Sequence, residues 1–182
     1  MSRIPVHTVD SASEPGRETL SKLAKRFGKV LNIHGEMAHS PVVLETYAAM
    51  NAAITRHGTF DARTREAIAL AVGAVDRCSY CQAAHTLSAK AAGLTEDQTV
   101  AIRRGAADFD DRLDALVRVV REIAGEVGEV SDDTWKRAQE AGWSDVQLTE
   151  AFAHVAVNMF TNYFNHYART DLDIPAAPVL RS

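Results

Sequence analysis

Residues 64–93 read TREAIALAVGAVDRCSYCQAAHTLSAKAAG, and this stretch decides the fold. Its first half is apolar on most sides, which is typical of a buried helix, and Asp61 stands where a helix N-cap is expected. Its second half begins near Cys78 and ends at Gly93, a residue that favours the end of a helix. The stretch therefore predicts two consecutive helices with a buried first member.

Helix-start and helix-end signals continue on both sides of this stretch. Pro15 begins a first helix that runs to about residue 29, and a second helix begins at Pro41 and ends before Gly58. Capping boxes begin further helices at residues 95–98 and 144–147, and residues 112–127 have the apolar spacing of an amphipathic helix. With no alternating β-branched run in the sequence, we expect an all-α fold of about eight helices.

The chain has 182 residues, of which 46% are hydrophobic, and this predicts one domain over residues 1–182. Residues 1–15 are expected to form an N-terminal arm and residues 171–182 a C-terminal tail. The formal charge of −4 and the dispersed basic residues argue against nucleic acid as a partner. No secretory signal or membrane-spanning segment is recognised, so a cytoplasmic location is expected.

Two stripes of side chains follow the last predicted helix, TEAFAHVAVNMFTNYFNHYART. The apolar stripe contains Phe152, Val155, Met159, Tyr163 and Tyr167, and the polar stripe contains His154, Asn158, Asn162 and His166. We interpret the polar stripe as a face that is solvated or hydrogen-bonded to other helices. The alternative places one of its members near the cysteines or at a subunit interface, and no catalytic role is assigned to any of them.

The only two cysteines of the chain stand three residues apart, and a histidine follows four residues later. In a helix, Cys78, Cys81 and His85 share one face, and both sulfurs lie in the first turn, where the helix dipole favours a thiolate. The dipole contributes only about 0.3–1 kcal/mol, so a thiol with a pKa of about 8.5 needs further help. Arg77 adds a positive charge, and His85 is the expected base.

Glu66 is the candidate partner that orients His85. It lies on the apolar first helix of the stretch, where a carboxylate is rare unless it is paired or functional. The competing interpretation is a solvent-exposed glutamate of the first helical turn, favoured there by the dipole. In the functional interpretation, Glu66 accepts a proton from His85 directly or through water.

The combined pattern E-x11-C-x-x-C-x-x-x-H resembles the AhpD-like alkylhydroperoxidase core of the carboxymuconolactone decarboxylase superfamily. The resemblance is strong over residues 64–93 and looser over about 40–170. It implies an all-α fold, assembly into homo-oligomers such as trimers or hexamers, and a dithiol peroxidase that needs no metal or haem. The decarboxylase branch usually lacks the cysteine pair, which argues against lactone decarboxylation.

The resemblance also implies roles for individual residues. Cys81 corresponds to the peroxidatic thiol and Cys78 to the resolving thiol, with His85 and Glu66 as the proton relay. Tyr80 departs from the family pattern, because AhpD itself has a histidine just before the second cysteine. The implied partners are a small hydroperoxide and an external dithiol reductant, either thioredoxin-like or lipoyl-bearing.

Three alternatives remain open at this point. The cysteines and His85 have zinc-ligand character, but a structural zinc site usually needs a fourth ligand and no second Cys/His pair is present. The pair could instead exchange disulfides or sense redox state with little peroxide chemistry. Finally, both cysteines could be inert core residues.

Overall fold

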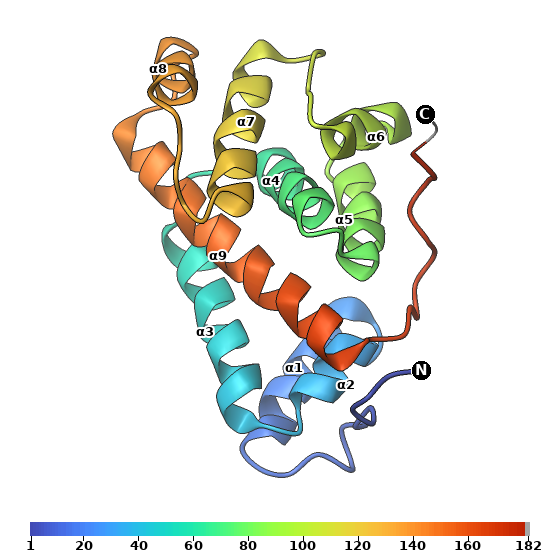
Figure 1. Ribbon diagram of the computed structural model, residues 1–182. Helices are drawn as coiled ribbons and strands as arrows, with labels where there is room; N and C mark the ends of the chain where they lie inside the picture. The colour runs from blue at the N-terminus through green and yellow to red at the C-terminus, as the bar shows by residue number, and fades with distance from the viewer. Residues whose placement is uncertain (181–182) are drawn as a thin grey trace.

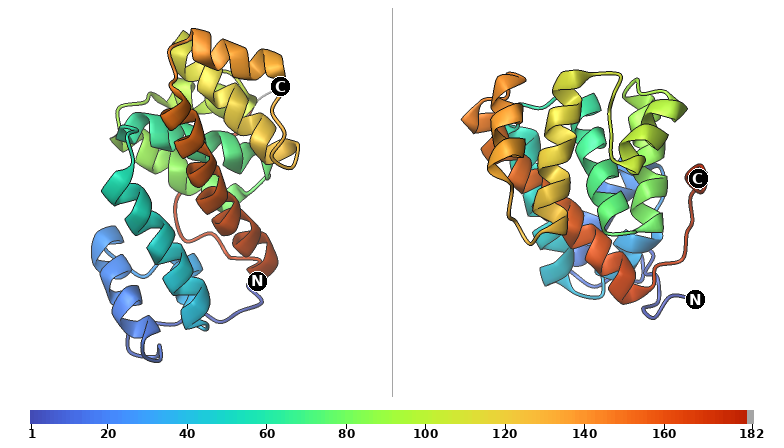
Figure 2. Two further views of the ribbon diagram at one scale, coloured as in Figure 1. Left: turned by 90° about the vertical axis from the view of Figure 1, so that its left-hand side faces the viewer. Right: turned by 45° about the horizontal axis from the view of Figure 1, so that its top comes forward.

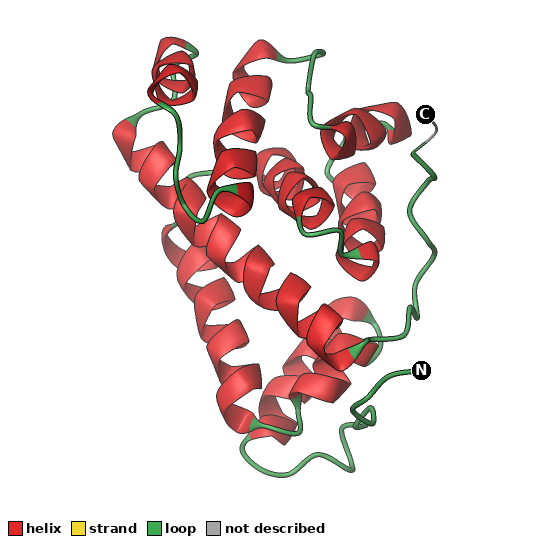
Figure 3. Ribbon diagram, in the orientation of Figure 1, coloured by secondary structure: helices red, strands yellow, loops and turns green. Residues whose placement is uncertain are grey.

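The computed structural model describes residues 1–180, and these residues form helices and loops without a strand (Figure 3). In chain order the helices are α1 (Gly16–Phe27), α2 (Asn32–Met37), α3 (Pro41–His57), α4 (Ala62–Val75), α5 (Ser79–Ala91), α6 (Glu96–Arg104), α7 (Asp111–Gly125), α8 (Asp132–Glu140) and α9 (Asp145–Ala168). The predicted all-α class is confirmed. None of the described helices is long and apolar enough to cross a membrane.

Helix boundaries follow the capping residues. The Asp61 carboxylate accepts a hydrogen bond from the Thr64 backbone N–H, and Thr95 and Ser144 each form a complete capping box. Pro41 occupies the first turn of α3. The six-residue α2 was beyond sequence prediction, because a segment of fewer than two turns is too short to show a helical period.

Helix α4 is the centre of the larger of two cores. It lies between α5, α6 and α7, and α9 crosses it diagonally (Figure 1). Ala67, Ile68, Leu70, Ala71 and Val72 are buried there, which confirms that this apolar helix lies in the core. Burial on nearly all sides explains why its sequence lacks a polar stripe.

The smaller core is formed by α1, α2 and α3, which lie in the lower part of the molecule in Figure 1 and in the left view of Figure 2. Leu20, Met37 and Leu44 are its largest fully buried side chains. Cys78, Tyr80 and Cys81 belong to the same cluster. The first turn of α5 therefore projects from the larger core into the smaller one.

Both terminal segments are hydrogen-bonded to the folded body. In the N-terminal arm, the Arg3 N–H donates to the Ala168 carbonyl and the His7 N–H donates to the Gly35 carbonyl. In the C-terminal tail, the Arg103 guanidinium donates to the Pro178 carbonyl. The predicted tail is described as far as residue 180, and residues 181–182 lie outside the described residues.

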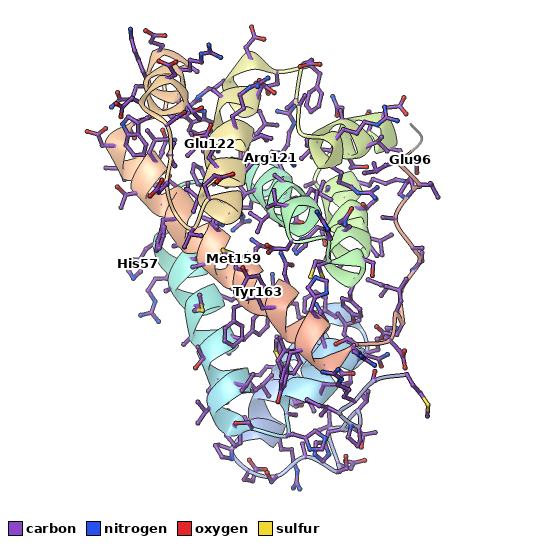
Figure 4. The ribbon with its side chains drawn as sticks, in the orientation of Figure 1. His57, Glu96, Arg121, Glu122, Met159 and Tyr163 are labelled. Carbon is purple, nitrogen blue, oxygen red and sulfur yellow. The ribbon has the colours of Figure 1, made fainter. Side chains whose placement is uncertain are left out.

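The two stripes of α9 are placed differently from a simple amphipathic helix. Phe152, Tyr163 and Tyr167 are exposed, whereas Val155 is buried and Met159 is half-buried. Met159 and Tyr163 are labelled along this helix in Figure 4. Three members of the polar stripe, in contrast, are buried: His154, Asn158 and Asn162. A stripe that is apolar by sequence thus faces outward, and much of the polar stripe faces inward.

Hydrogen bonds explain the inward polar stripe. The Asn162 side-chain amide donates to the Asp76 carboxylate at 2.7 Å, and the Asn158 amide donates to the His154 carbonyl at 2.8 Å. His154 lies 3.2 Å from the Glu150 carboxylate. His166 is exposed, and its Nε2 lies 2.8 Å from the Asp76 carbonyl oxygen. The cross-helix interpretation therefore holds for Asn162 and His166, both of which bind the turn before the cysteines.

Candidate active site

The turn between α4 and α5 places the cysteines. Cys78 is the N-cap of α5, and its N–H donates to the Gly73 carbonyl at 2.9 Å. A Cβ atom at Gly73 would lie 3.5 Å from the Cβ of Cys81, so the two helices approach closely at this point. Arg77 adopts a left-handed φ of 54°, which ends α4 and turns the chain into α5.

Both sulfurs are buried and share hydrogen-bond donors. The Cys78 sulfur accepts the backbone N–H of Cys81 at 3.2 Å, as the N-cap side chain of a helix does. From α9, the Asn165 amide lies 3.2 Å from the Cys81 sulfur and 3.8 Å from the Cys78 sulfur. The cysteines are free thiols with exposed fractions of 1% for Cys78 and 3% for Cys81.

The two thiols differ in acidity. Hydrogen bonding from the Cys81 thiol, together with the Cys81 backbone N–H and the nearby His166, lowers the pKa of Cys78 from 9.0 to about 7, against the opposing effect of burial. Burial and the adjacent Cys78 sulfur raise the pKa of Cys81 well above 9.0. Cys78 is therefore the more acidic thiol of the pair, and the Cys81 S–H donates to its sulfur.

His85 and Glu66 form the predicted pair. The His85 Nδ1 lies 2.8 Å from the Glu66 carboxylate, across the α4–α5 interface, and both side chains are partly buried. Burial opposes a charge on His85, but the Glu66 carboxylate outweighs it and raises the pKa of the imidazole. The imidazole is thus suited to hold a proton beside the thiols at neutral pH.

A cavity brings Cys81 together with this pair. It has two lobes that share six lining residues, namely Arg26, Tyr47, Asn51, Glu66, His85 and Thr161. The first lobe, of about 170 Å³, also includes Cys81 and Asn165, and the second, of about 150 Å³, extends towards His154 and Asn158. Cys81 is therefore the sulfur that a small molecule in this cavity would meet.

Cys78 faces elsewhere. It lines a separate surface pocket with Tyr80, His166 and Arg169, and it is absent from the lining of the Cys81 cavity. The sequence places both cysteines and His85 on one helical face, but Cys78 is the N-cap and precedes the helix itself. Its backbone is extended, with ψ at 101°, while its sulfur remains hydrogen-bonded to Cys81.

Tyr80, the residue that departs from the family pattern, forms a hydrogen bond to the C-terminal tail. Its hydroxyl donates to the Asp173 carboxylate at 2.7 Å, and Asp173 also forms an ion pair with Lys29 at 3.0 Å. Burial and the neighbouring Asp173 raise the pKa of Tyr80, so its hydroxyl stays protonated. Tyr80 thereby ties the start of α5 to the C-terminal tail and the loop after α1.

Asn165 was not predicted from the sequence, and His166 was named only as a member of the polar stripe for which one alternative was a position near the cysteines. Asn165 touches both sulfurs, and His166 supplies the positive charge expected from Arg77, whose side chain instead lines a different surface pocket with Arg121. The polar stripe of α9 was the available signal, since His166 belongs to it. Asn165 has no local signal, because its role depends on how α9 crosses α5.

The described residues contain no group of three or more His, Cys, Asp or Glu side chains arranged to hold a metal ion. Cys78 lines one pocket, while Cys81 and His85 line another. A thiol site with an adjacent imidazole–carboxylate pair is the chemistry that this arrangement supports.

The site thus combines two buried free cysteines with a histidine–glutamate pair in an all-α fold. Residues 41–122 match the sequence model of the carboxymuconolactone decarboxylase family. An uncharacterized protein of Haemophilus influenzae is 38% identical over 69 residues, which amount to 38% of this chain and 56% of that relative.

Solved structures share the fold over nearly the whole chain. A peroxidase-related protein of Ralstonia eutropha JMP134, described as an alkylhydroperoxidase AhpD core, has a TM-score of 0.84 at 20% identity, covering 94% of this chain and 92% of that one. The debrominase Bmp8 has a TM-score of 0.78 at 15% identity, covering 93% and 90%. A peroxidase-related protein of Silicibacter sp. TM1040 has a TM-score of 0.80 at 16% identity, covering 99% and 96%. Residues 41–122 are thus similar to the carboxymuconolactone decarboxylase family, and the chain shares the fold of these solved structures.

Proposed function

We propose that this protein is a thiol-dependent peroxidase that reduces organic hydroperoxides with Cys78 and Cys81. The observation that carries the proposal is the lining of one cavity by Cys81, His85 and Glu66, with a thiolate held at Cys78 directly behind it. A reacting sulfur, a proton donor and a second sulfur are the three parts that a dithiol peroxidase needs.

The first chemical step begins with the hydrogen bond between the two sulfurs. The Cys78 thiolate takes the proton of the Cys81 thiol, and the Cys81 thiolate attacks the terminal oxygen of the hydroperoxide. The O–O bond breaks, Cys81 becomes a sulfenic acid, and protonated His85 gives its proton to the leaving alkoxide, which departs as an alcohol. Glu66 holds the imidazole in place and stabilises its charged form.

The second step joins the sulfurs. The Cys78 thiol attacks the Cys81 sulfenic acid, a disulfide forms and water leaves. An external dithiol then reduces the disulfide by exchange and becomes a disulfide itself, which restores both cysteines. Cys81 is the peroxidatic thiol in this scheme and Cys78 the resolving thiol. Reduction by a thioredoxin-like or lipoyl-bearing protein, and assembly into trimers or hexamers, remain predictions for reductant assays and light scattering.

Stopped-flow oxidation by cumene hydroperoxide tests the proposal. We expect the reduced protein to react much faster than free cysteine, Cys81→Ser to abolish the reaction, and Cys78→Ser to stop at a sulfenic acid that dimedone traps. Exchanged phenotypes would reverse the roles of the two sulfurs. A reaction no faster than that of free cysteine would refute the proposed peroxidase activity.

One observation favours a second candidate, a thiol-disulfide oxidoreductase. Cys78 has a pKa of about 7 and lines a surface pocket of its own, beside the side chains of His166 and Arg169. A low-pKa thiol that lines a surface pocket is suited to thiol–disulfide exchange, although the Cys78 side chain is only 1% exposed. Faster oxidation by a protein disulfide than by cumene hydroperoxide would favour this candidate.

A further inference from the structure

The Cys81 lobe of the cavity is the size of a single ring. Its volume is about 170 Å³, and an apolar cavity of about 150 Å³ is large enough to bind benzene. The rings of Phe27, His34, Tyr47 and Tyr80 are among its walls. A flat substituent of one ring therefore fits both the volume and the walls, whereas a long acyl chain does not fit within this lobe.

The charges around the cavity favour an anion. Arg26 lines both lobes and Arg65 lines the second, while Glu66, already bonded to His85, is the only acidic residue of either lining. Within residues 1–180, neither arginine side chain has an ion-pair or hydrogen-bond partner. In a chain with a net charge of −4, two unpaired guanidinium groups at one cavity produce a local positive field.

His34 adds a polar group without a partner. It is 3% exposed, it lies between Phe27 and Tyr47 at ring-centroid distances of 5.3 and 5.4 Å, and its Nδ1 has no hydrogen-bond partner in the described chain. Burial, with a further contribution from nearby Arg26, lowers the pKa of His34 to about 4. A neutral imidazole of this kind offers one N–H donor to a ligand.

The helices that carry these groups lie outside the part of the chain that defines the family. Arg26 and Phe27 end α1 and His34 lies in α2, whereas the family match begins at residue 41. The dithiol and its relay belong to the matched region, whereas Arg26, Phe27 and His34 precede it. The wall is therefore where this chain can set its own substrate preference.

We propose that the cavity beside Cys81 selects a ring-sized organic hydroperoxide that carries a carboxylate or similar anionic group, which Arg26 and His34 bind. The ring lies against the aromatic wall and the hydroperoxide group faces Cys81. Arg26 and His34 are specificity-determining residues in this arrangement. The inference rests on the proposed peroxidase function for the identity of the reacting group, but not for the recognition of the anionic ring.

Binding of benzoate and benzamide to the reduced protein tests the recognition without any peroxide chemistry. Calorimetry should show benzoate binding about fivefold more tightly than its neutral isostere, the ratio expected for a partly exposed charge pair. Arg26→Gln should abolish this difference. Lys25→Gln, which makes the same charge change on the neighbouring exposed residue, should retain it. Equal affinities, no binding of either compound, or an unchanged preference in Arg26→Gln would overturn the proposal.

His34→Phe keeps a ring in the wall and removes both nitrogens. We expect this variant to bind benzoate more weakly and benzamide equally well. An unaltered affinity for benzoate would show that His34 does not take part in recognition. The kinetic arm compares cumene hydroperoxide with its para-carboxylate. The KM for the carboxylate should be about fivefold lower in the wild type and equal to that for cumene hydroperoxide in Arg26→Gln. If neither hydroperoxide reacts while benzoate binding depends on Arg26, the peroxidase proposal fails and the anion site stands.

Discussion

Removal of the Cys81 thiol should make Cys78 less acidic. The Cys81 S–H is the largest cause of the low pKa of Cys78, while the backbone N–H of residue 81, the Asn165 amide and the His166 charge remain in a Cys81→Ala variant. We expect the pKa of Cys78 to rise from about 7 by about one unit, which corresponds to about 1.4 kcal/mol. At pH 7 the thiolate fraction then falls from about a half to about a tenth.

The rate of iodoacetamide alkylation as a function of pH measures this change, with the modified cysteine identified by mass. At about pH 7, alkylation of Cys78 should be about fivefold slower in Cys81→Ala than in the wild type. The matched variant Cys78→Ala should leave a Cys81 thiol that titrates above the ordinary range, because burial remains. A lower pKa for Cys81 in Cys78→Ala than for Cys78 in Cys81→Ala would refute the assignment of the resting thiolate.

Three further predictions concern the surroundings of the thiols. Glu66→Gln and His85→Ala should each slow the stopped-flow reaction with cumene hydroperoxide about 10- to 100-fold. The melting temperature should change little in either variant. A large loss of stability would instead indicate a structural role. Tyr80→Phe removes the hydrogen bond to Asp173, so urea unfolding should show a loss of about 1–2 kcal/mol in the free energy of unfolding. The rate of reaction with peroxide should change less than about twofold. A tenfold slower rate would instead make Tyr80 part of the proton relay. The pKa of His34 is about 4 in the folded protein and 6.5 in the unfolded chain. As the pH falls, the unfolded chain therefore binds a proton at His34 before the folded protein does. Up to about 3 kcal/mol of folding stability is lost between pH 6.5 and about pH 4. His34→Phe should lack this part of the acid destabilisation in urea unfolding at about pH 7 and about pH 4.5, and an identical loss in both proteins would contradict the neutral buried imidazole.

Local signals predicted most of the fold. Asp61, Thr95 and Ser144 cap their helices through side chains only a few residues away, so the sequence carries the whole interaction. The pairing of Glu66 with His85 was also predictable, because two consecutive helices carry these residues and pack against each other. An interaction that is local in sequence, or fixed by one helix pair, can be recognised from the sequence alone.

The rest of the site depends on packing between distant segments. Asn165 reaches the sulfurs from a helix that begins more than sixty residues after Cys81, and His34 reaches the same cavity from a helix too short to predict. The separate pockets lined by Cys78 and Cys81 were missed for another reason. Helical spacing does not apply to an N-cap residue, whose backbone is extended.

The central claim is that Cys78 and Cys81 turn over hydroperoxide as a pair. Intact-mass analysis of the reduced protein before and after one equivalent of cumene hydroperoxide tests this most directly, with peptide mapping to locate the change. We expect a loss of two hydrogens and a disulfide between Cys78 and Cys81. An unchanged mass, or added oxygen atoms that persist on Cys81 without a disulfide, would contradict it.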